Sequence, residues 1–185
     1  MKNSLSIVLS GEAGQGLQTI EELVVSAASD SYHVFSVKDL MSRVRGGNNT
    51  VEIRISSESI HAFQHSIDLL FLLNEDAFYR LKDRVSHQTT IFTEAELKLN
   101  EMAKEAGGSI LMNVILFGLI GSLLKLDKNS CTMRIQGKFK NKSEKIIEDN
   151  LKAFELGYQK GSYYSISKQI DKTAFSRNYK TIDGN

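Results

Sequence analysis

A short apolar segment, a glycine-rich turn and an amphipathic segment follow one another near the N-terminus, and this order constrains the fold most. Residues 5–10 are rich in β-branched and aliphatic side chains, as in a buried strand. Gly11, Gly14 and Gly16 form the turn, and from residue 17 to about 31 apolar residues recur at helical spacing. A strand, a tight turn and a helix in this order predict the opening unit of an α/β fold.

The rest of the chain continues the alternation. Further strands are predicted at 33–37, 51–56, 67–73 and 89–92, and further helices at 75–84, 94–106, 110–125 and 140–161. Because strands and helices alternate, we expect a mostly parallel sheet covered by helices, in a Rossmann-like three-layer domain.

The chain is predicted to form one domain and a tail. Its 185 residues, 41% of them hydrophobic, suffice for one substantial core. The domain is expected at 1–161. Residues 162–185 are polar and aperiodic, and we interpret them as a linker or tail that leads toward a further domain.

Composition excludes several function classes. Lys and Arg number 23 against 22 Asp and Glu, so the net charge of +1 gives no overall field that attracts nucleic acid or an anionic membrane, although a local basic patch stays open as an alternative. The most hydrophobic window, 110–124, is too short to span a bilayer, and no secretory signal is recognisable, so we expect a cytoplasmic protein. A single cysteine, Cys131, excludes an internal disulfide and a cysteine-ligated iron–sulfur cluster, and we expect it to be structural.

The turn at 11–16 is the first candidate binding site. Glycines let backbone N–H groups approach a ligand, and the start of the following helix favours an anion such as a phosphate. Its spacing, G-x-x-G-x-G, is neither the dinucleotide pattern nor a P-loop. Asp39, near the end of the second predicted strand, keeps a nicotinamide cofactor as an alternative, and a ligand-free turn is another.

The segment 43–49, RVRGGNN, is the second candidate. Its two arginines could pair with phosphate or carboxylate groups, and the alternative is a solvated loop. Both candidate segments follow predicted strands, so they are expected at the same edge of a parallel sheet, where ligands usually bind.

These segments resemble a known family. G-E-A-G-Q-G before a helix, R-V-R-G-G-N, V-E-I-R-I-S and I-D-L-L-F-L-L-N are similar in order and spacing to the gamma domain of 2-oxoacid:ferredoxin oxidoreductases. Asn113, the F-x-x-K at 139–142 and the N-x-x-A-x-x-x-G-Y at 150–158 extend the likeness to residues 5–158. The final residues, 181–185, resemble the start of the alpha domain in relatives where gamma and alpha are fused.

The resemblance implies a multi-subunit enzyme that oxidatively decarboxylates a 2-oxoacid to an acyl-CoA. Thiamine diphosphate and Mg²⁺ would sit on the partner alpha and beta parts, and iron–sulfur clusters on other domains or subunits of the complex. Ferredoxin or flavodoxin would accept the electrons. This chain would carry no catalytic residue and no metal, would be inactive alone, and would take coenzyme A as its candidate ligand. Removed from its partners, it could form a homodimer through its docking surface.

The residues carried over from the family would donate hydrogen bonds to coenzyme A phosphates or to a neighbouring subunit, and the two roles stay open. They are Gly11, Gly14, Gln15, Gly16, Arg43, Arg45, Gly46 and Gly47. Two alternatives remain: a free-standing nucleotide-binding or regulatory domain, and a docking module without a ligand. His61 and His65 have i, i+4 spacing but no further ligand beside them, and a polar surface stretch is the favoured interpretation.

Overall fold

The computed structural model describes residues 3–12, 14–39 and 48–173, which fold into an α/β domain around one sheet. Five strands in this part of the chain are ordered β2-β3-β1-β4-β5. They are β1 (Ser4–Glu12), β2 (His33–Asp39), β3 (Asn48–Ser56), β4 (Leu69–Leu72) and β5 (Thr90–Thr93). All five predicted strands are present, with bounds that differ by a few residues.

Four of the strands run in one direction, which confirms the mostly parallel sheet. β4 is parallel to β1 and to β5, whereas β3 is antiparallel to both of its neighbours, β1 and β2. The reversal of β3 has a simple cause. A crossover between parallel strands needs about a dozen residues or more, and residues 40–47 between β2 and β3 are too few.

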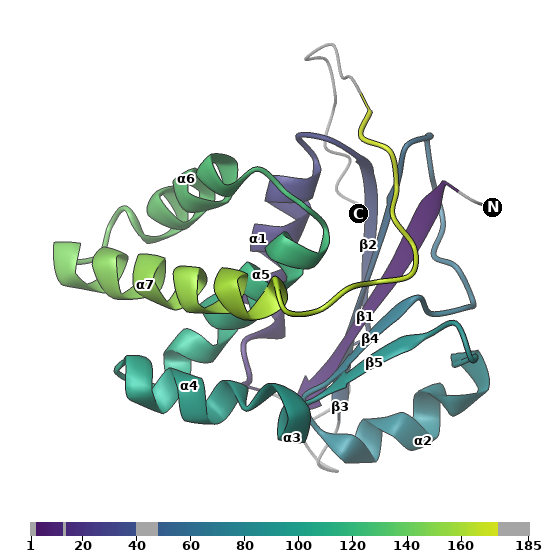
Figure 1. Ribbon diagram of the computed structural model, residues 1–185, viewed down its shortest axis with the longest axis horizontal. Coiled ribbons are helices and arrows are strands. Elements are labelled where there is room, and N and C mark those ends of the chain that lie inside the picture. The colour runs from purple at the N-terminus through teal and green to yellow at the C-terminus, as the bar shows by residue number, and fades with distance from the viewer. Residues whose placement is uncertain (1–2, 13, 40–47, 174–185) are drawn as a thin grey trace.

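Helices cover both faces of the sheet (Figure 1). They are α1 (Leu17–Ala28), α2 (Phe78–Leu81), α3 (Glu94–Leu97), α4 (Leu99–Ala106), α5 (Met112–Leu123), α6 (Lys128–Phe139) and α7 (Glu144–Gly161). Short 3-10 turns, η2 (Glu75–Ala77), η3 (Lys82–Arg84) and η4 (Ser109–Leu111), flank α2 and precede α5. On the first face, Leu5, Ile7 and Leu9 of β1 share an apolar cluster with α1 and α5. On the second face, Val8 and β4 pack against η2 and α2, which completes the three layers.

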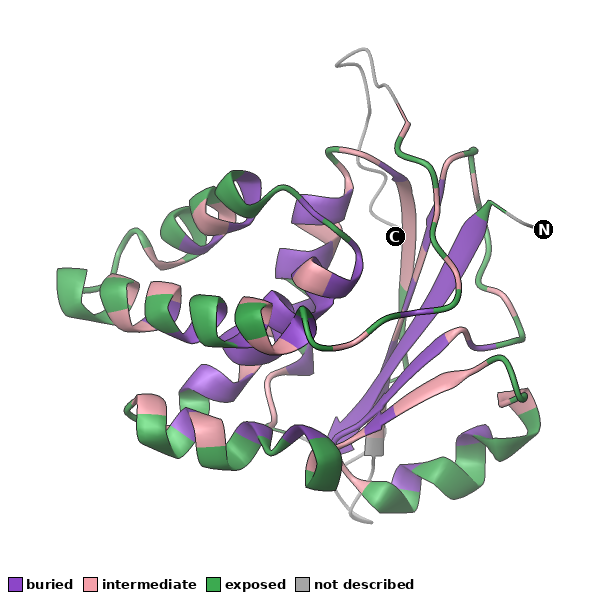
Figure 2. Cartoon of the chain, viewed as in Figure 1, coloured by how far each residue is buried: buried purple, intermediate pink, exposed green. Residues whose placement is uncertain are grey.

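The centre of the core is α5, whose residues are buried along almost its whole length (Figure 2). α7 approaches it unusually closely, because glycines form the contact. A Cβ placed on Gly157 would lie 1.8 Å from the Ile115 carbonyl oxygen, and one on Gly118 would lie 2.2 Å from the Phe154 carbonyl oxygen. Ala153, fully buried, lies one turn before Gly157. The N-x-x-A-x-x-x-G-Y segment is therefore a helix-packing motif.

Two features of the helical layer differ from the expectation. The helix predicted at 94–106 is broken at Lys98, whose φ of 54° is left-handed, so α3 and α4 are separate. α6 was not predicted, because its apolar pattern is sparse and only Cys131 and Ile135 among its apolar side chains are buried. It begins where the Asp127 side chain accepts a hydrogen bond of 2.7 Å from the Ser130 N–H. Among the described helices, none is both long and apolar enough to cross a bilayer.

Residues 162–173, called the strap below, follow α7 and run across the sheet without forming a helix or strand (Figure 1). The Tyr164 ring packs edge-on against Phe92 of β5, with centroids 5.4 Å apart. Lys168 Nζ lies 2.9 Å from an Asp68 carboxylate oxygen, just before β4. The Thr173 N–H donates to the Ser31 carbonyl, 2.8 Å away, before β2. The first part of the expected tail therefore lies on the domain from β5 to β2.

Candidate binding site at the carboxyl edge of the sheet

The glycine turn connects β1 to α1 at the carboxyl edge of the sheet. Gly14 and Gly16 have φ values of 99° and 72°, a region that side chains with a Cβ rarely adopt. Gln15 closes the turn, since its Oε1 accepts a 2.7 Å hydrogen bond from the Glu12 N–H. A Cβ on Gly11 would lie 2.3 Å from this oxygen, so Gly11 makes room for Gln15. Gln15 and Gly11 therefore shape the turn.

Two asparagines that the sequence analysis did not select lie against this turn. Asn74 follows β4, and its Nδ2 donates a 2.8 Å hydrogen bond to the Glu12 carboxylate. Asn113, in the first turn of α5, packs on Gly16 so closely that a Cβ there would lie 2.0 Å from Asn113 Nδ2. Both residues belong to the segments that carry the family resemblance, and that was the signal available in the sequence.

The turn has the polarity of an anion site. The first turn of α1 contains no acidic residue, and no side chain caps its N-terminus. The first N–H groups of a helix have no acceptor inside the helix and carry partial positive charge. The half-buried Asn113 amide makes no side-chain hydrogen bond with the described residues. Because none of the described residues lies within 4 Å of a Cβ built on Gly14, they leave the backbone there open to a ligand.

The structure brings together half of the predicted site residues. Gly11, Gly14, Gln15 and Gly16 form the turn just described. The other half, Arg43, Arg45, Gly46 and Gly47, lies outside the described residues. The positions that flank this segment are at the same edge as the turn, because Asn48 pairs with Glu12 and Asp39 pairs with Thr50.

The position of Asp39 does not fit a nicotinamide cofactor at the glycine turn. In a dinucleotide-binding fold the acidic residue ends the strand next to β1. Here β3 lies between β1 and β2, so Asp39 is two strands away from the glycine turn, roughly 10 Å. The Asp39 carboxylate also accepts a 3.0 Å hydrogen bond from Arg80, on the second face.

The remaining candidate side chains are His61, His65 and Cys131. His61 and His65 lie in the irregular segment between β3 and β4, where His61 Nε2 contacts Ser59 Oγ at 3.2 Å. Within the described ranges, no group of three or more His, Cys, Asp or Glu side chains could hold a metal ion. Cys131 is fully buried, and burial raises the pKa of its thiol to about 12, which makes it unreactive in the folded state.

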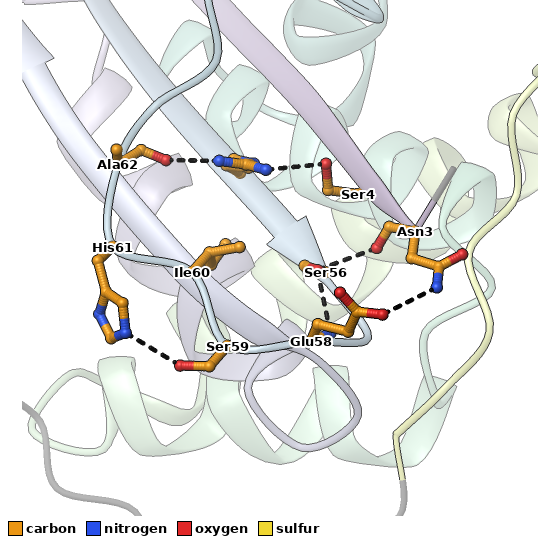
Figure 3. A pocket seen from close by; sticks show the side chains of 9 residues that line it. Asn3, Ser4, Ser56, Glu58, Ser59, Ile60, His61 and Ala62 are labelled. Atoms are coloured by element: carbon orange, nitrogen blue, oxygen red, sulfur yellow. Dashed lines mark hydrogen bonds between the residues drawn. The ribbon is translucent and has the colours of Figure 1, made fainter. Parts of the chain in front are cut away.

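A polar pocket of about 250 Å³ lies at the opposite edge, between the ends of β1 and β3 and the segment that follows β3 (Figure 3). Its polar groups bond to one another. Arg54 donates to the Ala62 carbonyl and to Ser4 Oγ, and Ser56 Oγ donates to the Asn3 carbonyl over 3.0 Å. Because these groups stabilise the loop, the pocket is a weaker candidate than the glycine turn.

The chain thus presents an open glycine turn on a Rossmann-like α/β domain with one reversed strand. It belongs to the pyruvate ferredoxin/flavodoxin oxidoreductase family, whose model matches residues 6–160, and this confirms the family recognised in the sequence. A search of curated proteins finds no match.

Solved structures with the same fold include three proteins described as 2-oxoacid or pyruvate oxidoreductases. The 2-oxoglutarate:ferredoxin oxidoreductase from Magnetococcus marinus, with 2-oxoglutarate, coenzyme A and succinyl-CoA bound, has a TM-score of 0.86 and 20% identity over 94% of this chain. This chain spans about a third, 34%, of that protein.

The other two are small subunits matched over nearly their whole length. The gamma subunit of a keto/oxoacid ferredoxin oxidoreductase from Geobacter sulfurreducens has a TM-score of 0.64 and 22% identity, covering 86% of this chain and 99% of that one. Subunit PORC of pyruvate oxidoreductase from Thermotoga maritima has a TM-score of 0.62 and 17% identity, covering 85% and 97%. At these identities the likeness establishes the fold.

Proposed function

We propose that this chain is the gamma domain of a multi-subunit, thiamine-diphosphate-dependent 2-oxoacid:ferredoxin or flavodoxin oxidoreductase. In the proposed reaction the bond between C1 and C2 of the 2-oxoacid breaks and CO₂ leaves. The acyl group joins the sulfur of coenzyme A, one proton is released, and two electrons pass to the acceptor protein. The observation that carries the proposal is the family match over residues 6–160.

In this proposal the chain binds and docks, and the alpha and beta parts supply the chemistry. Thiamine diphosphate and its Mg²⁺ are proposed to belong to those parts, and the iron–sulfur clusters to other domains or subunits of the complex. The single cysteine of this chain is buried in the core, which suits a domain without a cluster of its own. A cytoplasmic location, expected from the sequence, remains a prediction.

The carboxyl edge fits the phosphates of coenzyme A. The open backbone at Gly14, the uncapped start of α1 and the amide of Asn113 together offer neutral donors to an anion. Arg43 and Arg45 are proposed to add guanidinium groups from the segment between β2 and β3, whose flanks lie at this edge. The coenzyme A reported in the Magnetococcus marinus structure supports this choice of ligand.

We also propose that the chain corresponds to the gamma part of a fused gamma–alpha polypeptide. The Magnetococcus marinus structure matches 94% of this chain, and the matched part is 34% of that protein. The two small subunits match a smaller share of this chain, 86% and 85%. The strap and the residues after it would then connect the gamma part to the alpha part.

Reconstitution tests the function. The chain is combined with its alpha and beta partners, thiamine diphosphate, coenzyme A and several 2-oxoacids, and viologen reduction is followed with and without the chain. Coenzyme A-dependent reduction that requires the chain supports the proposal and identifies the substrate. If the chain neither associates nor changes the rate, the assignment is wrong, and a separate nucleotide-binding role becomes the better explanation.

Three variants separate coenzyme A binding from docking. Arg43→Ala and Arg45→Ala should each raise the KM for coenzyme A roughly tenfold or more, because a hydrogen bond to a charged group is worth about 1.5–3 kcal/mol. Asn113→Ala should raise it by about fivefold, the value of one ordinary hydrogen bond. Asn129→Ala, on the exposed side of α6, is the matched control. Weaker assembly with an unchanged KM would assign this edge to docking alone.

A further inference from the structure

We propose that β2 is a docking edge for a second copy of this chain, which pairs its own β2 antiparallel to it. β2 is the last strand on its side of the sheet, and among the described residues its only strand neighbour is β3 (Figure 1). In an antiparallel pair every second residue bonds to the neighbour, and the remaining N–H and C=O groups point away from it. β2 therefore presents a row of backbone donors and acceptors.

Two features that usually prevent edge pairing, a proline and a β-bulge, are missing from β2. The chain contains no proline, and the register between β2 and β3 runs through all seven residues without a bulge. Its charged residues are held by its own chain. Lys38 Nζ lies 2.8 Å from the Glu21 carboxylate of α1, and Asp39 accepts a hydrogen bond from Arg80. These ion pairs hold the two charges over the faces of the sheet, Lys38 on the side of α1 and Asp39 on the side of α2.

The apolar side chains of β2 are only partly covered. Phe35 is half-buried and Val37 is 38% exposed, and neither belongs to the two apolar clusters of the domain. Both lie on the second face, opposite the helices α1 and α5. Figure 2 shows the contrast, since β2 is mostly in the intermediate colour whereas β1, at the centre of the sheet, is buried.

The sequence of β2 complements itself when two copies pair about an axis through Ser36. Phe35 of each copy then lies opposite Val37 of the other, an aromatic pair with a β-branched residue that stabilises sheets. In this register all seven residues of β2 have a partner in the other copy. A shift that keeps the same side chains on the same face of the sheet moves the strand by two residues and leaves the residues at its ends without a partner. The complementarity selects a second copy as the partner.

A cysteine on the axis tests the pairing directly. In Ser36→Cys the two cysteines would face each other with their Cα atoms about 4.5–5.5 Å apart, within the range of a disulfide. Cys131 is fully buried and does not compete. The matched control is Ser86→Cys, an exposed position just before β5 at the other side of the sheet. Under mild oxidation the first variant should form a covalent dimer and the control should stay monomeric.

Sedimentation of the full-length chain gives a second measurement. The unmodified chain should show a dimer whose fraction rises with concentration. Val37→Lys should weaken the dimer roughly tenfold, because it removes two symmetric cross-strand pairs. Tyr79→Lys, on α2 and 76% exposed, makes the same kind of change elsewhere and should have no effect. Circular dichroism confirms that both variants are folded.

Three outcomes would overturn the proposal. One is a chain that is monomeric at all concentrations and whose Ser36→Cys variant does not cross-link. Another is equal cross-linking of the two cysteine variants, which would indicate random collision. The third is cross-linking of Ser36→Cys to an alpha or beta subunit in the reconstituted complex, which would assign the edge to a different chain. None of these outcomes depends on the enzyme activity, so the docking edge and the proposed function fail separately.

Discussion

Replacing Gly157 by alanine tests whether the close contact of α7 with α5 holds the core together. The added Cβ would lie 1.8 Å from the Ile115 carbonyl oxygen and 2.6 Å from its carbon, whereas ordinary contact begins at 3.4 Å. Both obstructing atoms belong to the backbone, so no side-chain rotation relieves the clash. The two helices must move apart, and the side chains packed between them lose contact.

The expected size follows from two opposing effects. Alanine favours a helix over glycine by about 1 kcal/mol. Overpacking a rigid core costs about 1–3 kcal/mol and occasionally more, and a clash between two backbones belongs at the upper end. The net loss should therefore be about 2 kcal/mol of unfolding free energy, or about 4–8 °C in Tm for a domain of this size.

Gly137 provides the control for this prediction. It lies in α6, and no atom of the part of the chain that the structure describes is within 4 Å of a Cβ built on it. Gly137→Ala should therefore gain about 0.5–1 kcal/mol from helix propensity alone. Urea unfolding followed by circular dichroism measures both variants. The reasoning is refuted if Gly157→Ala is as stable as Gly137→Ala, since the close contact would then carry no energetic cost.

Three further predictions concern charges and the thiol. The hydrogen bond from Lys138 lowers the pKa of Glu22 below its ordinary value of 4.5. Lys138→Gln should therefore have a lower unfolding free energy than the unmodified chain at neutral pH, and this difference should shrink as the pH falls below about 4.5. Unfolding curves of both proteins, measured at a series of acid pH values, test this. Lys168→Met should release the strap from Asp68, and hydrogen exchange should rise in residues 162–173 while α5 stays protected. Cys131 should react with a thiol reagent only at the rate of unfolding, since it is fully buried, and fast reaction of the native chain would contradict this.

The pattern of apolar residues was enough to predict the strands and the long helices. Residues 5–10 and 67–73 are continuous apolar runs, and the structure places them in the centre of the sheet as β1 and β4. The reversal of β3 was within reach of the sequence too, because residues 40–47 cannot form a crossover. α6 was not, because the side chains that fix it act through tertiary contacts. Arg134, for example, pairs with Asp30 after α1, 2.7 Å away.

The glycine turn was predictable in place but not in detail. Three glycines after an apolar run indicate a tight turn before a helix, and that is what the structure contains. Spacing alone could not reveal that Gln15 folds back on the Glu12 N–H, or that Asn113 lies against Gly16 from a helix almost a hundred residues later. Contacts of this kind depend on how α5 crosses the sheet, and no local pattern encodes that.

The strap has a consequence for the order in which the chain folds. Lys168 reaches back 100 positions to Asp68, and Thr173 Oγ1 reaches back 116 positions to the Ser57 carbonyl, so these contacts are among the least local in the domain. Non-local contacts close late, because the chain between them must first become ordered. During synthesis the N-terminal parts fold first, and the part of the sheet that the strap crosses stays exposed until the strap itself emerges. A protein that binds this part of the sheet would have to do so in this interval, before the strap closes.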